Sequence, residues 1–61
     1  MKFGDNVRVT GGFFINQVGV LVDAKFHAGD GSYSYVVFFK SPKFPDGFER
    51  LIIGSNLEKL D

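Results

Sequence analysis

The sequence predicts an all-β fold, a small barrel of five strands, and two observations carry that prediction. Apolar and polar residues alternate with a period of two along several stretches, whereas a helical period is nearly absent. Turn-forming residues separate these stretches at intervals of about ten residues, which is typical of small barrels and sandwiches. The 61 residues make one domain, spanning 1–61, and closing its sheet into a barrel removes exposed sheet edges.

The first two strands follow from this alternation. Val7–Thr10 reads apolar, charged, apolar, polar, and Gly11-Gly12 ends it. A second strand is expected from Val18 to about Phe26, because the valines at 18, 20 and 22 share one face. The segment between them, residues 13–16, is expected to be a loop with exposed rings.

The third strand is expected at Tyr33–Phe39, which is rich in aromatic and β-branched residues. The preceding segment, His27–Ser32, contains glycine and aspartate and is expected to be a hairpin turn. Alternate residues of the strand face opposite ways, so Val36 and Phe38 oppose the set at 35, 37 and 39. One set is core, and we expect the following loop to cover the other. If it is left exposed, it is a second candidate interface.

The last part of the chain contains both prolines. Proline cannot donate to a sheet ladder, so Ser41–Phe48 is expected to be a loop, followed by a strand at Glu49–Ile53. Residues 54–56 end that strand. The closing segment Leu57–Leu60 is too short for a helix, which needs about 12 residues, so a single 3₁₀ turn leading into a short fifth strand is expected.

The composition argues against several classes of function. The chain has no cysteine and a single histidine, His27, so we expect no disulfide, no metal site and no cofactor. The acidic residues are scattered and no nucleophile motif is present, so we expect no enzymatic activity. Seven basic residues balance seven acidic ones, which disfavours nucleic acid, because neutralised phosphates supply most of that affinity.

The sequence also bears on location. No stretch approaches the roughly 20 apolar residues of a membrane helix. The opening run Met1–Asp5 lacks the apolar core of a signal peptide. We therefore expect a cytoplasmic protein with no membrane partner.

Phenylalanine is the most unusual feature of the composition. The chain has eight, whereas a core of this size has room for roughly four or five large rings. Phe13 and Phe14 fall in the first predicted loop, and Phe44 and Phe48 fall in the third. In an up-and-down meander these loops lie at the same end of the barrel, so the four rings are expected to form one aromatic rim.

An exposed aromatic rim points to a binding surface. A protein partner or a second copy of the chain is favoured over nucleic acid. Cations near the rim would also suit stacked bases. The candidate binding residues are Phe13, Phe14, Asn16, Phe44, Phe48, Arg8, Lys40 and Lys43. Gly12 and Gly19 are interpreted as structural positions of the loop.

Two segments resemble a known family. The pattern Gly4-Asp5-x-Val7-Arg8-Val9-x-x-Gly12-x-Phe14, followed by Gly19-Val20, resembles the KOW motif of SH3-like barrels in ribosomal proteins and transcription elongation factors. The segment Leu51–Lys59 resembles the closing strand and turn of the same barrels. This resemblance implies a small five-stranded SH3-like barrel with a short 3₁₀ turn before the last strand, and a first loop that contacts RNA.

Two further resemblances concern other SH3-like barrels. Phe14–Gly19 and Tyr33–Phe39 are similar to stretches of the small stromal subunit of photosystem I, which implies a barrel that docks onto larger subunits. The Gly4–Arg8 opening also resembles type B dihydrofolate reductase, whose four protomers line one catalytic pore. At the positions of that family's Val-Gln-Ile-Tyr stretch this chain has residues 51–54, Leu-Ile-Ile-Gly. An oligomeric pore enzyme of this kind is therefore kept only as a third alternative function, and we expect no turnover of dihydrofolate with NADPH.

Overall fold

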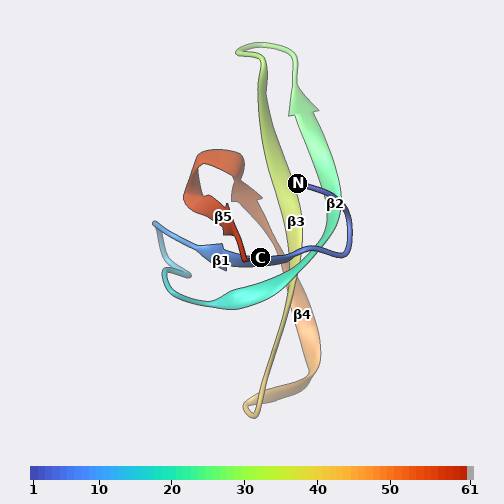
Figure 1. Cartoon of the computed structure of the whole chain (residues 1–61), viewed down its shortest axis with the longest axis vertical. Coiled ribbons are helices and arrows are strands. Elements are labelled where there is room, and N and C mark those ends of the chain that lie inside the picture. The colour runs from blue at the N-terminus through green and yellow to red at the C-terminus, as the bar shows by residue number, and fades with distance from the viewer. Residues whose placement is uncertain (61) are drawn as a thin grey trace.

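The computed structural model describes residues 1–60 as five antiparallel strands and one short 3₁₀ turn (Figure 1). The elements are β1 (Asn6–Val9), β2 (Val18–His27), β3 (Ser32–Ser41), β4 (Phe44–Ile53), η1 (Gly54–Asn56) and β5 (Leu57–Lys59). The sheet order is β4-β3-β2-β1-β5, so β1 joins the last strand to the meander of β2, β3 and β4. The all-β prediction and the 3₁₀ turn before the last strand are confirmed, and the arrangement is compatible with an SH3-like barrel.

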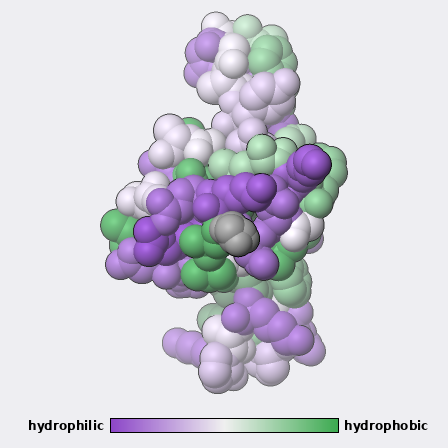
Figure 2. Space-filling view, in the orientation of Figure 1, coloured by the Kyte–Doolittle hydropathy of each residue, from purple (hydrophilic) through white to green (hydrophobic). Residues whose placement is uncertain are grey.

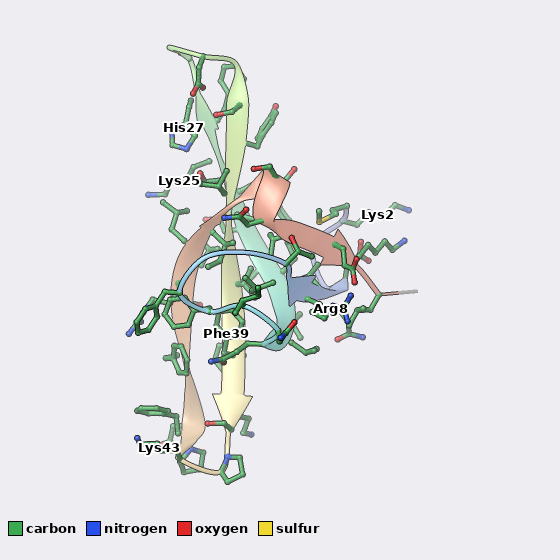
Figure 3. All side chains as sticks on the ribbon, turned by 90° about the vertical axis from the view of Figure 1, so that its left-hand side faces the viewer. Lys2, Arg8, Lys25, His27, Phe39 and Lys43 are labelled. Carbon is green, nitrogen blue, oxygen red and sulfur yellow. The ribbon has the colours of Figure 1, made fainter. Side chains whose placement is uncertain are left out.

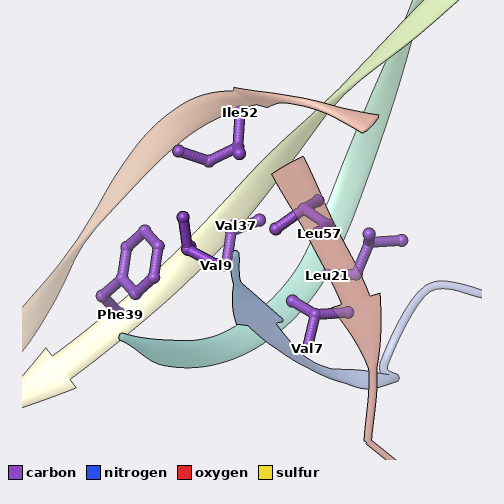
Figure 4. Packing of buried hydrophobic residues seen from close by; sticks show 7 residues of the cluster. All are labelled: Val7, Val9, Leu21, Val37, Phe39, Ile52 and Leu57. Atoms are coloured by element: carbon purple, nitrogen blue, oxygen red, sulfur yellow. The ribbon is translucent and has the colours of Figure 1, made fainter. Parts of the chain in front are cut away.

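The hydrophobic core is small and draws on every strand. The alternation in β1 places Val7 and Val9 inside with no exposed surface, while Arg8 between them is exposed. β3 contributes Val37 and Phe39, which belong to one of the two faces predicted for this strand. Seven residues make up this core, shown in Figure 4: Val7, Val9, Leu21, Val37, Phe39, Ile52 and Leu57.

Two long hairpins extend from this core in opposite directions. Figure 1 shows the β2–β3 hairpin at one end of the long axis and the β3–β4 hairpin at the other, and the molecule measures 37 × 22 × 19 Å. Its accessible surface is 4269 Å², whereas a compact monomer of 6.8 kDa exposes about 3,950 Å². This larger area fits the elongated shape. Large apolar side chains, among them Phe3, Phe13 and Ile53, remain exposed, and Figure 2 shows hydrophobic residues on the surface in green.

The predicted loop over 41–48 is wrong. The turn is confined to Pro42-Lys43, and β4 already begins at Phe44. Pro45 is tolerated inside this strand because β4 is at the edge of the sheet, where a missing N–H costs no ladder bond on the open side. The register with β3 also shifts between Phe39 and Ser41, which takes Pro45 out of the regular ladder.

The covering expected over the second face of β3 comes from this irregular part of β4. Phe38 is half-buried, and its ring lies against Gly47 so closely that a Cβ at that glycine would overlap it. Gly47 also has a φ of +81°, which favours glycine. Val36, on the same face as Phe38, is half-buried as well, and Leu51 beside it on β4 is exposed.

Within residues 1–60 there is no helix with the length and apolar character needed to cross a membrane.

Candidate functional site

The four phenylalanines of the predicted rim lie together, two from the first loop and two from β4. The Phe13 and Phe14 rings meet edge to face with centroids 5.1 Å apart, and Phe44 and Phe48 do so at 5.2 Å. Phe14 and Phe48 join the two pairs at 6.3 Å. These four residues are called the Phe cluster below. Such aromatic pairs stabilise one another by about 0.5–1.5 kcal/mol beyond their buried area.

The first loop holds its two rings in different environments. Asn16, at a φ of +71°, donates its backbone N–H to the Val9 carbonyl at 2.7 Å, and Gln17 donates its own to the Phe14 carbonyl at 3.1 Å. This compact turn stacks Phe14 on the core ring of Phe39 at 5.8 Å. Phe13 stays 94% exposed. The expectation of two exposed rings in this loop is therefore corrected for Phe14, which is half-buried.

β4 supplies the other two rings. Phe48 stands opposite Phe39 in the sheet register, and their ring centroids are 5.4 Å apart. Phe44 begins the strand, donates its backbone N–H to the Ser41 hydroxyl at 3.3 Å, and leaves half of its surface exposed. Phe39 thus supports both Phe14 and Phe48 from the core, whereas Phe13 and Phe44 form the open rim.

The Phe cluster surrounds a pocket of about 340 Å³. Ligand sites in proteins begin at about 300 Å³ and combine apolar walls with a few polar groups. Here the polar groups are Gln17 and Arg50. The Arg50 guanidinium carbon lies 5.0 Å from the Phe48 ring centroid and 5.9 Å from that of Phe14, within the range of a cation–π contact.

Arg50 was missed by sequence reasoning. It lies two residues after Phe48 on the same strand, and it stands opposite the core residue Val37. Residues two apart on a strand share a face, so the period-two pattern carried forward from Phe48 would have placed Arg50 beside the rings. The strand was instead predicted to begin at Glu49, which hid that relation.

The cations expected at the rim do not line the pocket of the Phe cluster. Arg8 forms an ion pair with Glu58, its register partner on β5. Figure 3 shows Arg8 on the β1 side of the molecule and Lys43 at the β3–β4 turn. Neither of them, nor Lys40 or Asn16, lines the pocket.

The two glycines proposed as structural have separate reasons for being glycine. Gly12 has a φ of +87°, which few other residues adopt without strain. Gly19 is buried where β2 crosses β3, and a Cβ there would lie 2.6 Å from both the Phe38 carbonyl oxygen and a methyl carbon of Val37.

A larger pocket of about 820 Å³ lies at the tip of the β2–β3 hairpin. The His27 Nε2 and Ser34 Oγ atoms are 2.8 Å apart there, which resembles a base and a nucleophile. However, Ser34 is only 5% exposed, and the Asp30 carboxylate accepts hydrogen bonds from Ser32, not from the imidazole. We interpret this network as one that fixes the hairpin.

The pKa of Asp30 should show whether the hydrogen bonds at the tip of the β2–β3 hairpin are formed. The hydrogen bond from the Ser32 hydroxyl, with a second from its N–H, holds the pKa of Asp30 below its ordinary value. A lowered pKa in the folded state means that the contribution to stability is present at neutral pH and is lost as the pH falls through that pKa. We expect Ser32→Ala to raise the Asp30 pKa in an NMR titration of the carboxyl carbon. Ser55→Ala, a control at η1, should leave it unchanged, and equal midpoints in all three proteins would contradict the assignment.

Comparisons with protein-family models, with curated proteins and with solved structures find no match for this chain. Among residues 1–60, no three His, Cys, Asp or Glu side chains are grouped so that they could hold a metal ion. The pocket of the Phe cluster offers apolar contact and ring stacking, with hydrogen bonding from Gln17 and a positive charge from Arg50.

Proposed function

We propose that this chain is a non-catalytic binding and assembly module whose Phe cluster contacts a protein partner or a second copy of the chain. The observation that supports it is the gathering of four rings, two from the first loop and two from β4, around an open pocket. Exposed apolar patches mark interaction sites, and aromatic and arginine side chains carry most of the energy at protein interfaces.

The charges at this end of the molecule favour protein over nucleic acid. The β3–β4 hairpin carries charges of both signs. Its cations are Lys40, Lys43 and Arg50, and its anions are Asp46 and Glu49. The chain as a whole has a formal charge of zero. Binding to phosphates relies on an excess of cations, and its affinity falls steeply with salt.

RNA binding of the KOW type is the second candidate, and the stacking of Arg50 on two rings favours it, because stacked bases use the same surfaces. A titration with single-stranded RNA at about 50 and 200 mM salt separates the two candidates. Binding that weakens by orders of magnitude between these salt concentrations would support RNA, and no binding at the lower one would remove it.

Phe44→Ala is the substitution that tests the proposal without disturbing the core. Phe44 is 49% exposed, and within the cluster its ring pairs only with that of Phe48. Phe14 is less suitable, because its ring also packs on the core residue Phe39. If the surface is a self-interface, light scattering after size-exclusion chromatography should show a dimer or larger species whose dissociation constant rises at least tenfold in Phe44→Ala.

Phe26→Ala provides the matched control. Phe26 is 57% exposed and lies at the far end of β2, in contact with Tyr33 and not with the Phe cluster. An equal loss of assembly in both variants would argue against the Phe cluster as the interface. A monomer at every concentration would leave the cluster open to a different protein, which the peptide experiment below examines.

A further inference from the structure

β4 is an edge strand of the sheet, and one of its two edges is free. β4 pairs only with β3, and within residues 1–60 no strand pairs with its other side. The first half of that edge is protected by Pro45 and by the irregular backbone at Gly47. The second half, Glu49–Ile53, has no proline and no register shift with β3. An unprotected edge of this kind is a template for pairing with another strand.

Two pockets lie beside β4 and share residues of the first loop, and together they are called the groove. A pocket of about 240 Å³ lies between the first loop and β4, and it shares Phe13 and Phe14 with the pocket of the Phe cluster. Its other walls are the loop glycines and the second half of β4, namely Gly11, Gly12, Leu51, Ile52, Ile53 and Asn56. The two pockets together follow β4 from Phe44 to Ile53. Five residues of an extended peptide, about 17 Å long, match the unprotected half.

Arg50 gives this groove a charge requirement. One of its five N–H donors is used by the Glu49 carbonyl, which accepts from Nη1 at 2.7 Å. Within residues 1–60, the pair of Arg8 and Glu58 is the only ion pair. Arg50 therefore has no carboxylate partner among these residues. A cation that is already stacked on two rings and still has free donors favours a ligand carboxylate, which it can bind with two parallel hydrogen bonds.

We propose that the groove binds an extended acidic peptide segment of another protein, which adds as a strand to the free edge of β4. The added strand places an apolar or aromatic side chain in the Phe cluster and a carboxylate against Arg50. Alternate residues of a strand share a face, so the two recognised side chains are two positions apart in the peptide, as Phe48 and Arg50 are on β4. Strand addition draws affinity from backbone hydrogen bonds and specificity from the pockets for alternate side chains. This inference rests on the proposed function and names the chemistry of its partner.

The test is an NMR titration of the ¹⁵N-labelled full chain with two capped eight-residue peptides. One contains Phe-Thr-Glu at its centre, and the other contains Phe-Thr-Gln and is otherwise identical. We expect the amides of residues 11–14 and 49–53 to shift, outward-facing amides of β4 to exchange more slowly with solvent, and the Gln peptide to bind at least fivefold more weakly. Arg50→Gln should abolish that difference. Lys43→Gln, which removes a cation outside the groove, should preserve it.

Each other outcome overturns a defined part of the proposal. Equal affinities for the two peptides in the unmodified chain exclude the carboxylate requirement, and this comparison does not depend on how any variant folds. Shifts in the Phe cluster without slower exchange in β4 exclude strand addition but leave the proposed function standing. Peptide binding that is unchanged in Phe44→Ala excludes the proposed function as well. If the NMR signals of the β4 amides shift when only the protein concentration is raised, a second copy of the chain occupies the groove. That result would overturn the proposal of a peptide from another protein.

Discussion

Replacing Gly19 with alanine is expected to unfold a large part of the population at room temperature. The added Cβ would lie 2.6 Å from the Phe38 carbonyl oxygen and 3.0 Å from the Phe39 ring, and a carbonyl in a sheet ladder cannot move aside. Forcing an extra methyl into a packed site costs about 1–3 kcal/mol, and we expect the upper part of that range here. A domain of this size rarely has more than about 3–5 kcal/mol of stability, so the loss is most of the total.

Thermal unfolding followed by circular dichroism measures this loss. A change of 1 kcal/mol moves the midpoint of a domain this small by about 4–8 °C, so a decrease of about 10–20 °C is expected for Gly19→Ala. Gly29→Ala is the control, because a Cβ at that turn position meets nothing within 4 Å. It should change stability by no more than about 0.5 kcal/mol. If both variants have the same midpoint, the close packing of β2 on β3 at Gly19 is not a determinant of stability.

The parts of the fold that depend on local pattern were predictable from the sequence. Period-two alternation located β1, β2 and β3 to within two residues at each end. β4 was half missed, because Pro45 and Gly47 signal a loop when they are considered alone. Whether a proline is tolerated in a strand depends on the strand lying at a sheet edge, and that is a property of the whole topology.

The candidate site divides in the same way. The surplus of phenylalanine that led to the predicted rim is readable along the chain, but Phe44 and Phe48 belong to β4 and not to the predicted third loop. The charged member of the site was misassigned. Arg8 is closer in sequence to the first loop, but pairing between β1 and β5 brings Glu58 to it from 50 residues away. Arg50 shares a face of β4 with Phe48, and this relation was hidden because that strand was predicted to begin at Glu49.

Phe39→Ala should have the largest effect of any single substitution considered. Phe39 is 1% exposed, and its ring lies 5.8 Å from that of Phe14 and 5.4 Å from that of Phe48. Truncating a buried phenylalanine costs about 3–5 kcal/mol, which equals or exceeds the stability expected of the domain. We expect the variant to be unfolded in the absence of a ligand, with an NMR spectrum that has lost its dispersed amide signals.

The same substitution at Phe13 is the control, because that side chain is 94% exposed and its loss removes only the pair with Phe14, which stabilises by about 0.5–1.5 kcal/mol. Phe39→Leu tests the link between core and site, since it keeps an apolar side chain but removes the ring on which Phe14 and Phe48 pack. If Phe39→Leu folds but loses affinity at the Phe cluster, the core ring positions the site. If Phe39→Ala and Phe13→Ala have the same unfolding midpoint, this account is wrong. Residues other than Phe39 would then hold the Phe cluster in place.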